Sequence, residues 1–156
     1  MFWLTLAAVV GCGASGGALF AFSSFVMKGL ARLPAPQGIA AMQAINVTAP
    51  MPPFMIPFLG SALLCVGLAV VSVFMLDETA GAFLLIGAAL YLVGVIGLTG
   101  GYHVPRNNAL DAVDPDAADA ATVWSRYVAE WTRWNHVRSA AGLGAAACFA
   151  TALAVG

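Results

Sequence analysis

The sequence predicts an all-α membrane protein: a four-transmembrane-helix bundle with an amphipathic helix in the first long loop and a helical extension before the fourth span. Three observations predict this fold. The 156-residue chain is 62% hydrophobic and only 8% charged, whereas an average soluble domain carries about 25% charged residues. Four apolar runs account for most of the chain, each near the roughly 20 residues that cross a bilayer as a helix. None of them shows the short alternating pattern of barrel strands.

The four runs are expected to form one integral membrane domain, residues 1–156, with spans at about 3–27, 54–76, 79–102 and 137–156. Asp77 and Glu78 leave room only for a tight turn between the second and third runs. Because a short connection joins antiparallel helices, we expect these two spans to be neighbours.

Small residues inside the spans predict where helices approach closely. Gly13 and Gly17 are four residues apart, and Gly97 and Gly101 repeat that spacing. Such faces let two backbones come together in lipid, and they also leave room for a homodimer. The odd number of cysteines, all inside spans, favours packing as small apolar residues over a disulfide framework: Cys12, Cys65 and Cys148.

The positive charge of the chain is distributed asymmetrically. All six Lys and Arg residues belong to the two long loops or their membrane edges. The positive-inside rule therefore predicts that loops 28–53 and 103–136 are cytoplasmic and that both termini lie outside a bacterial-type inner membrane. The lipid bilayer is then a partner of the chain, and any chemistry in the loops would face the cytoplasm.

The first long loop contains a helical stretch from about residue 37 to 47 between two proline clusters. Four apolar residues of this stretch are expected to form a stripe that lies along the membrane interface: Ile39, Met42, Ala44 and Ile45. The second long loop begins where Pro105 is expected to end the third span. It continues through "DPDA", where Asp114 predicts a helix cap and Pro115 a first helical position. The following helix, from about residue 117 to 134, is expected to run into the fourth span.

Polar chemistry gathers in "WTRWNHVRS", residues 131–139, just before the fourth span. On a helix, Trp131, Asn135 and Arg138 form one stripe, Trp134 shares its edge, and His136 falls on a neighbouring face. Interfacial tryptophans and snorkelling arginines explain single residues of this group. Asn135 is harder to explain in that way, since an amide beside hydrocarbon is costly unless it is hydrogen-bonded.

Two other segments bring polar residues to the same membrane face. "GYHVPRNNAL" supplies His103, Asn107 and Asn108, and "MQAIN" supplies Asn46. Helix caps and turns are the structural explanation for these amides. The convergence of amides, histidines, an arginine and aromatic rings from three distant segments predicts a pocket between helices for a flat, partly polar molecule.

The sequence argues against several other kinds of site. It has no basic stripe for nucleic acid, no phosphate-binding glycine loop after a strand, and no serine–histidine pairing. No ionisable group stands near the middle of a span, which weakens a transporter interpretation. His103 and His136 could bind a metal, although no spacing typical of a preformed metal site links them, so the metal question stays open.

Four spans, "MQAIN", "VPRNNAL" and "WTRWNHVRS" together resemble the anthrone-oxygenase-like (DUF1772) family of small membrane proteins. The resemblance covers nearly the whole chain, and the asparagine after the proline and the W-x-x-W-N-x-x-R segment carry most of it. In the family pattern an asparagine often precedes the "VP", and His103 stands there in this chain. The resemblance implies oxidation of an anthrone-like aromatic by O₂ without a required cofactor.

The residues allow this chemistry to be assigned as a hypothesis. Arg138 with Asn135 would bind an oxyanion, Trp131 and Trp134 would form an aromatic slot, and His103 or His136 would act as the base. The asparagines 46, 107 and 108 would shape the substrate site. Two other functions stay open: a non-enzymatic membrane protein that binds or carries hydrophobic small molecules, and a metal-dependent redox protein that uses the two histidines.

Overall fold

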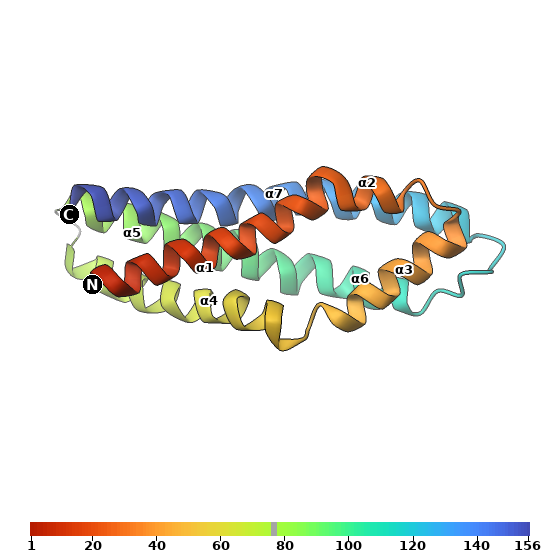
Figure 1. Ribbon diagram of the computed structural model, residues 1–156, viewed down its shortest axis with the longest axis horizontal. Coiled ribbons are helices and arrows are strands. Elements are labelled where there is room, and N and C mark those ends of the chain that lie inside the picture. The colour runs from red at the N-terminus through yellow and green to blue at the C-terminus, as the bar shows by residue number, and fades with distance from the viewer. Residues whose placement is uncertain (76–77) are drawn as a thin grey trace.

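Four long helices make up the bundle in the computed structural model, which describes residues 1–75 and 78–156 (Figure 1). Their bounds are Phe2–Leu30, Pro52–Met75, Thr79–Asp111 and Ala120–Val155, and each is long and apolar enough to cross a membrane. The part of the chain that is described contains no strand. The predicted all-α four-helix membrane bundle is therefore confirmed. The turn predicted around Asp77 and the end of the second predicted span at residue 76 fall outside the described residues.

Two of the long helices change their helical register along their length. The first consists of α1 (Phe2–Ala21), a π-helical segment (Phe22–Val26) and α2 (Met27–Leu30). The third consists of α5 (Thr79–Ala89), two π-helical segments and α6 (Val104–Asp111). The two π-helical segments span Leu90–Gly97 and Thr99–His103. The second long helix, α4 (Pro52–Ser72), ends in a short 3-10 turn, Val73–Met75.

The helix predicted in the first long loop is present as α3 (Ala35–Thr48). It packs against α7 (Ala120–Val155), with Ile39 and Met42 buried. Ala44, which was expected in the same stripe, is exposed, and Ile45 is half-buried. The predicted stripe therefore wrongly included Ala44. Another face of α3 contacts α6, where the Gln43 side chain donates to the carbonyls of Leu110 and Val113 at 3.0 Å each.

Two predicted helix boundaries are wrong. Pro105 does not end the third helix; it lies in the first turn of α6, where its missing N–H costs little because the π-helical segment Thr99–His103 precedes it. Asp114 does not cap a helix, since its carboxylate accepts a hydrogen bond from the backbone N–H of Asp116 at 3.0 Å within a turn. The last helix begins later, at Ala120, and then runs unbroken for 36 residues into the fourth span, as expected.

Both termini lie at one end of the bundle, and α3, α6 and the start of α7 lie at the other (Figure 1). α1 crosses the bundle diagonally: it starts beside α4 and approaches α7 as it continues toward α2. The tightest part of this crossing is a contact between Gly16 and Gly142, where a Cβ on Gly16 would stand 2.8 Å from the backbone nitrogen of Leu143. Gly17 and Gly101, from the glycine pairs predicted to make close contacts, meet nothing within 4 Å.

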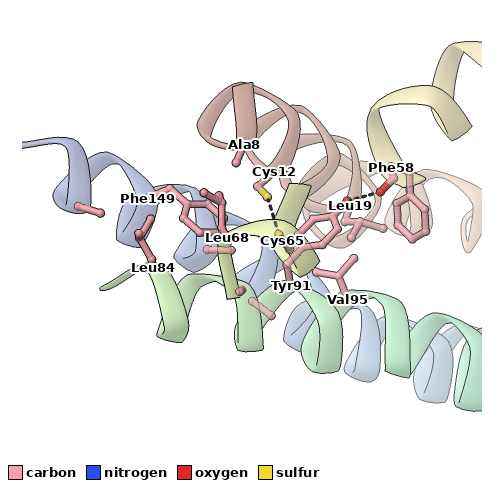
Figure 2. Close-up of a cluster of buried hydrophobic side chains, with 14 residues drawn as sticks. Ala8, Cys12, Leu19, Phe58, Cys65, Leu68, Leu84, Tyr91, Val95 and Phe149 are labelled. Carbon is pink, nitrogen blue, oxygen red and sulfur yellow. Dashed lines mark hydrogen bonds between the residues drawn. The ribbon is translucent and has the colours of Figure 1, made fainter. Parts of the chain in front are cut away.

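A hydrophobic core joins α1, α4, α5 and α7 in the half of the bundle near the termini (Figure 2). The Cys12 and Cys65 sulfurs lie 3.9 Å apart at its centre as free thiols, and Cys148 is also free. The Tyr91 hydroxyl donates to the Phe58 carbonyl at 2.9 Å, which satisfies both groups in an apolar environment. The thiols therefore pack as small apolar side chains, as expected.

A second hydrophobic cluster lies at the other end, where α3 packs on the first half of α7. Its buried members include four aromatic or sulfur-containing side chains of large volume: Met27, Met42, Trp124 and Trp131. Gly38 allows this packing, because a Cβ on it would stand 2.7 Å from the Trp124 ring. The second cluster positions α3 over the end of the bundle.

Candidate ligand site

A cavity of about 450 Å³ lies between the two hydrophobic clusters. Leu19 and Phe58 from the first cluster and Met42 and Trp131 from the second form parts of its wall. The cavity occurs where α1 has moved away from α4, and α3 covers the resulting space. Four residues that the sequence singled out line it: Asn46, Asn107, Trp131 and Arg138.

Arg138 is the only charged residue among those that line the cavity in the described part of the chain. Its side chain is 5% exposed. Its Nε and Nη2 donate to the Asn135 Oδ1 at 3.2 and 2.6 Å, and its Nη1 donates to the Thr99 hydroxyl at 3.1 Å. The guanidinium carbon lies 5.3 Å from the centre of the Trp131 ring. No carboxylate neutralises this buried cation in these contacts, so it is suited to attract an anionic oxygen in the cavity.

Asn135 holds the Arg138 side chain in place through hydrogen bonds. Its amide nitrogen donates to the Leu19 carbonyl and to the Ser23 hydroxyl, both at 2.8 Å, and its side chain is fully buried. Because both of its donor hydrogens are used, its oxygen must face Arg138. The carbonyl of Leu19 and the hydroxyl of Ser23 belong to the junction between α1 and the π-helical segment Phe22–Val26. Asn135 is thus a positioning residue that links α1 to the arginine.

Asn107 has an orientation that its neighbours determine. The Trp131 indole N–H donates to the Asn107 Oδ1 at 3.0 Å, and the Tyr127 hydroxyl donates to the same oxygen at 2.9 Å. An indole N–H is a donor only, so the atom that faces it must be the amide oxygen. The amide nitrogen of Asn107 consequently points away from both rings. Asn107 itself is among the residues that line the cavity.

His103 does not itself line the cavity, but it packs against Trp131, which does. Its side chain is 1% exposed, its Nδ1 lies 3.2 Å from the Leu98 carbonyl, and its Nε2 has no hydrogen-bond partner. The carbonyl requires a proton on Nδ1, which leaves Nε2 as a free lone pair in the neutral ring. The imidazole packs edge-on against Trp131, with ring centres 5.2 Å apart. The arrangement provides a buried proton acceptor next to a residue that lines the cavity.

The structure does not bring the other predicted site residues into the cavity wall. His136 and Asn108 are exposed. Trp134 is 37% exposed and packs on Tyr102, with ring centres 5.1 Å apart. These three residues face away because they lie on the outer sides of α7 and α6. Asn46 does line the cavity, and its amide nitrogen donates to the Asp111 carboxylate at 2.8 Å, which ties α3 to α6.

Sequence reasoning missed three residues that support the site: Ser23, Thr99 and Tyr127. Each is a hydroxyl in or near an apolar run, a signal too common in membrane helices to stand out. Two of them, Ser23 and Thr99, lie in π-helical segments, and such segments are frequent at functional sites. The register change in Thr99–His103 turns Thr99 and His103 toward α7, and no sequence pattern indicated it.

No three His, Cys, Asp or Glu side chains come together as a metal-binding group within residues 1–75 and 78–156. His103 is buried beside the cavity, whereas His136 is on the exposed side of α7. The two histidines therefore do not face the same space. The polar residues that line the cavity carry amides, hydroxyls and a guanidinium, which suit an oxygen-bearing organic ligand.

Comparison with known proteins identifies the family of the chain. The chain matches the sequence profile of the family described as "Anthrone oxygenase" over residues 54–148, from the start of α4 to the last turns of α7. No curated protein and no solved structure gives a match. The matched region contains every predicted site residue except Asn46. This chain belongs to the anthrone oxygenase family of membrane proteins.

Proposed function

We propose that the cavity binds a flat aromatic ketone of the anthrone type and that the protein oxidises it with O₂ to the corresponding quinone. The single observation that carries this proposal is the buried guanidinium of Arg138 on a cavity wall that is otherwise uncharged and mostly apolar or aromatic. A delocalised carbanion with its charge on oxygen is an anion that such a wall accommodates. Membership of the anthrone oxygenase family supports the same class of reaction.

The reaction needs no electrons from the protein. A base removes a proton from the ring methylene, and the charge spreads onto the ketone oxygen. The anion reacts with O₂, a carbon–oxygen bond forms, and the peroxide takes up the proton. Loss of water then breaks the O–O bond and the second C–H bond, and the new carbonyl remains. One oxygen atom of O₂ enters the product and the other leaves as water, so no cofactor is required for the balance.

Each part of this reaction would be carried out by a residue in the cavity or beside it. Arg138 would hold the ketone oxygen, and its attraction strengthens as that oxygen becomes an oxyanion. The Asn107 amide nitrogen would donate to the same ketone oxygen, while Trp131, Phe54 and Phe58 would contact the ring faces. His103 would accept the methylene proton at Nε2, which has no hydrogen-bond partner among the described residues.

The proposed site lies at the end of the bundle that carries the two long loops, which the positive-inside rule places in the cytoplasm. In this orientation the cavity lies near the membrane boundary, where an aromatic ketone partitions. A non-enzymatic protein that only binds such a molecule would use the same wall, so the decisive measurement is turnover.

The first experiment measures oxygen consumption by detergent-purified protein supplied with anthrone, with and without a chelator. Uptake above the spontaneous rate that survives chelation is expected. Arg138→Ala should lower that uptake about 100-fold, the usual loss for one oxyanion donor. Arg133→Ala is the matched control, because Arg133 is exposed on the same helix, and it should leave uptake unchanged.

Arg138 also supports the fold through Asn135 and Thr99, so its variants need a check of folding. Arg138→Lys keeps the charge and should retain part of the activity, while gel filtration and circular dichroism report on the bundle. Wild-type uptake no faster than the spontaneous rate, with anthrone still bound, would favour the binding protein. Uptake that disappears with the chelator would instead favour a metal-dependent oxidation.

A further inference from the structure

The walls of the cavity differ strongly in their exposure. The inner wall is buried: Leu19, Phe58, Trp131 and Arg138 are each 5% exposed or less. The exposed lining residues are instead Thr48 and Pro50, at the junction of α3 and α4, and Val104 at the start of α6. Ala49 lies between the first two and is half-buried. These four residues, 48–50 and 104, form the mouth of the cavity.

The mouth contains no charged residue, and its surroundings are apolar. Met51 and Ile56, which follow the mouth along the chain, are 49% and 71% exposed, and Val104 itself is 44% exposed. Large apolar side chains with this exposure are expected on a surface that faces lipid. A mouth that opened to water would expose them at a cost of about 25 cal/mol for each Å².

The position along the helices indicates the depth of the mouth in the membrane. The apolar run of α4 begins at Pro52, only two residues after Pro50. Arg106, the first charged residue after the third apolar run, follows two residues after Val104 and lies 3.4 Å from the centre of the Tyr102 ring. An arginine stacked on a tyrosine is typical of the headgroup boundary. The mouth therefore lies at the edge of the hydrocarbon layer, on the side of the two long loops.

We propose that the ligand enters the cavity sideways from the bilayer, through the mouth formed by residues 48–50 and Val104. This inference rests on the proposed function for the identity of the ligand. The substrate class is thereby narrowed to aromatic ketones that are uncharged outside the protein and dissolve in lipid, because an anion would have to cross this apolar mouth without a partner. Ionisation takes place inside, beside Arg138.

The test follows binding rather than turnover. Anthraquinone, which is not consumed, is supplied in phosphatidylcholine vesicles containing the protein, and quenching of tryptophan fluorescence is followed in time. The signal of Trp131 is obtained by subtracting the response of a Trp131→Phe variant. The quenching rate is expected to follow the ratio of anthraquinone to lipid. Anthraquinone-2-sulfonate, whose charge keeps it in water, is expected to quench Trp131 far less at equal total concentration.

Two variants narrow the mouth, and one serves as a control. Ala49→Phe should slow the quenching by about tenfold, since the ligand must wait for the larger side chain to move. Ala44→Phe places the same ring on an exposed position of the same helix away from the cavity, and it should leave the rate unchanged. Thr48→Phe provides a second obstruction if the variant at position 49 does not fold.

Different results separate the two proposals. Equal rates for Ala49→Phe and Ala44→Phe, or a rate that follows the aqueous concentration and is matched by the sulfonate, would overturn entrance from the bilayer. Absence of saturable quenching of Trp131 in the wild type would overturn the access route together with the ligand site. Saturable quenching without oxygen uptake from anthrone would overturn only the proposed oxidation.

Discussion

At the scale of single residues, the chemistry of the site depends on which hydrogen-bonding atoms are already occupied. Asn135 and Asn107 are both amides, yet one uses its two donors on the protein and the other uses only its oxygen. Asn135 is therefore a positioning residue, whereas the proposed site uses the Asn107 amide nitrogen as a donor to the ligand. Asn135 is fully buried and Asn107 is half-buried, and the donor-only indole of Trp131 fixes which atom of Asn107 is the oxygen.

Asn107→Asp tests this distinction. The aspartate keeps an oxygen for Trp131 and Tyr127 but replaces the free donor with a second oxygen that repels an oxyanion. Oxygen uptake with anthrone should fall about 100-fold, while the thermal midpoint changes little. Asn108→Asp adds the same charge on the exposed neighbouring position and should retain activity. Equal activity of the two variants would show that Asn107 does not face the ligand.

The two histidines allow a second matched comparison. His103→Gln removes the free lone pair beside Trp131, so oxygen uptake should become slow and nearly independent of pH. In the wild type the rate should fall on acidification, because only the neutral imidazole accepts a proton. His136→Gln, on the exposed side of α7, should keep the wild-type pH profile. An unchanged profile in His103→Gln would assign the base to another group.

At the scale of elements, the sequence predicted which helices exist better than how they are shaped. Length and hydropathy were enough for the four spans, and the proline clusters were enough for α3. The register of the third helix was not predictable, because its π-helical segments are too short to show a hydrophobic period of their own and Pro105 indicated an end instead of an altered turn. The stripe of Trp131, Asn135 and Arg138 was predictable, since it depends only on helical spacing.

The glycines show a similar limit of sequence reasoning. Spacing by four selects pairs on one face, but it does not say which face meets a neighbour. Gly17 belonged to a predicted pair and meets nothing, whereas the adjacent Gly16 contacts Gly142. The difference arises from the diagonal course of α1 across α7, which is a property of the whole bundle rather than of either helix.

This adjacent pair of glycines gives a sharp test of the α1–α7 crossing. In Gly16→Ala the new Cβ would lie 2.8 Å from a backbone atom of Leu143, so a helix has to shift. The loss of stability should be about 1–3 kcal/mol, the usual cost of overpacking. Gly17→Ala, which meets nothing within 4 Å, should be neutral or slightly stabilising. Thermal unfolding in one detergent measures both, and equal midpoints would contradict the contact.

At the scale of the whole molecule, the main hydrophobic core and the cavity lie in different halves of the bundle. The core around Cys12, Cys65 and Tyr91 lies toward the termini, and the cavity, α3 and the polar network lie toward the long loops. The family match begins at α4, so α1 and α3 lie outside it even though they supply part of the cavity wall.

The last prediction concerns the orientation of the bundle across the membrane. With every Lys and Arg at the loop end or its membrane edge, Asn108 should be cytoplasmic and the C-terminal Gly156 outside. Single cysteines at positions 108 and 156 are introduced after replacement of Cys148, since Cys12 and Cys65 are fully buried. A membrane-impermeant maleimide applied to intact cells should label position 156 and spare 108, and inverted vesicles should reverse this. The opposite pattern would place the Arg138 end of the bundle outside, where a ligand dissolved in lipid could still reach the mouth but water-soluble partners of the cytoplasm could not.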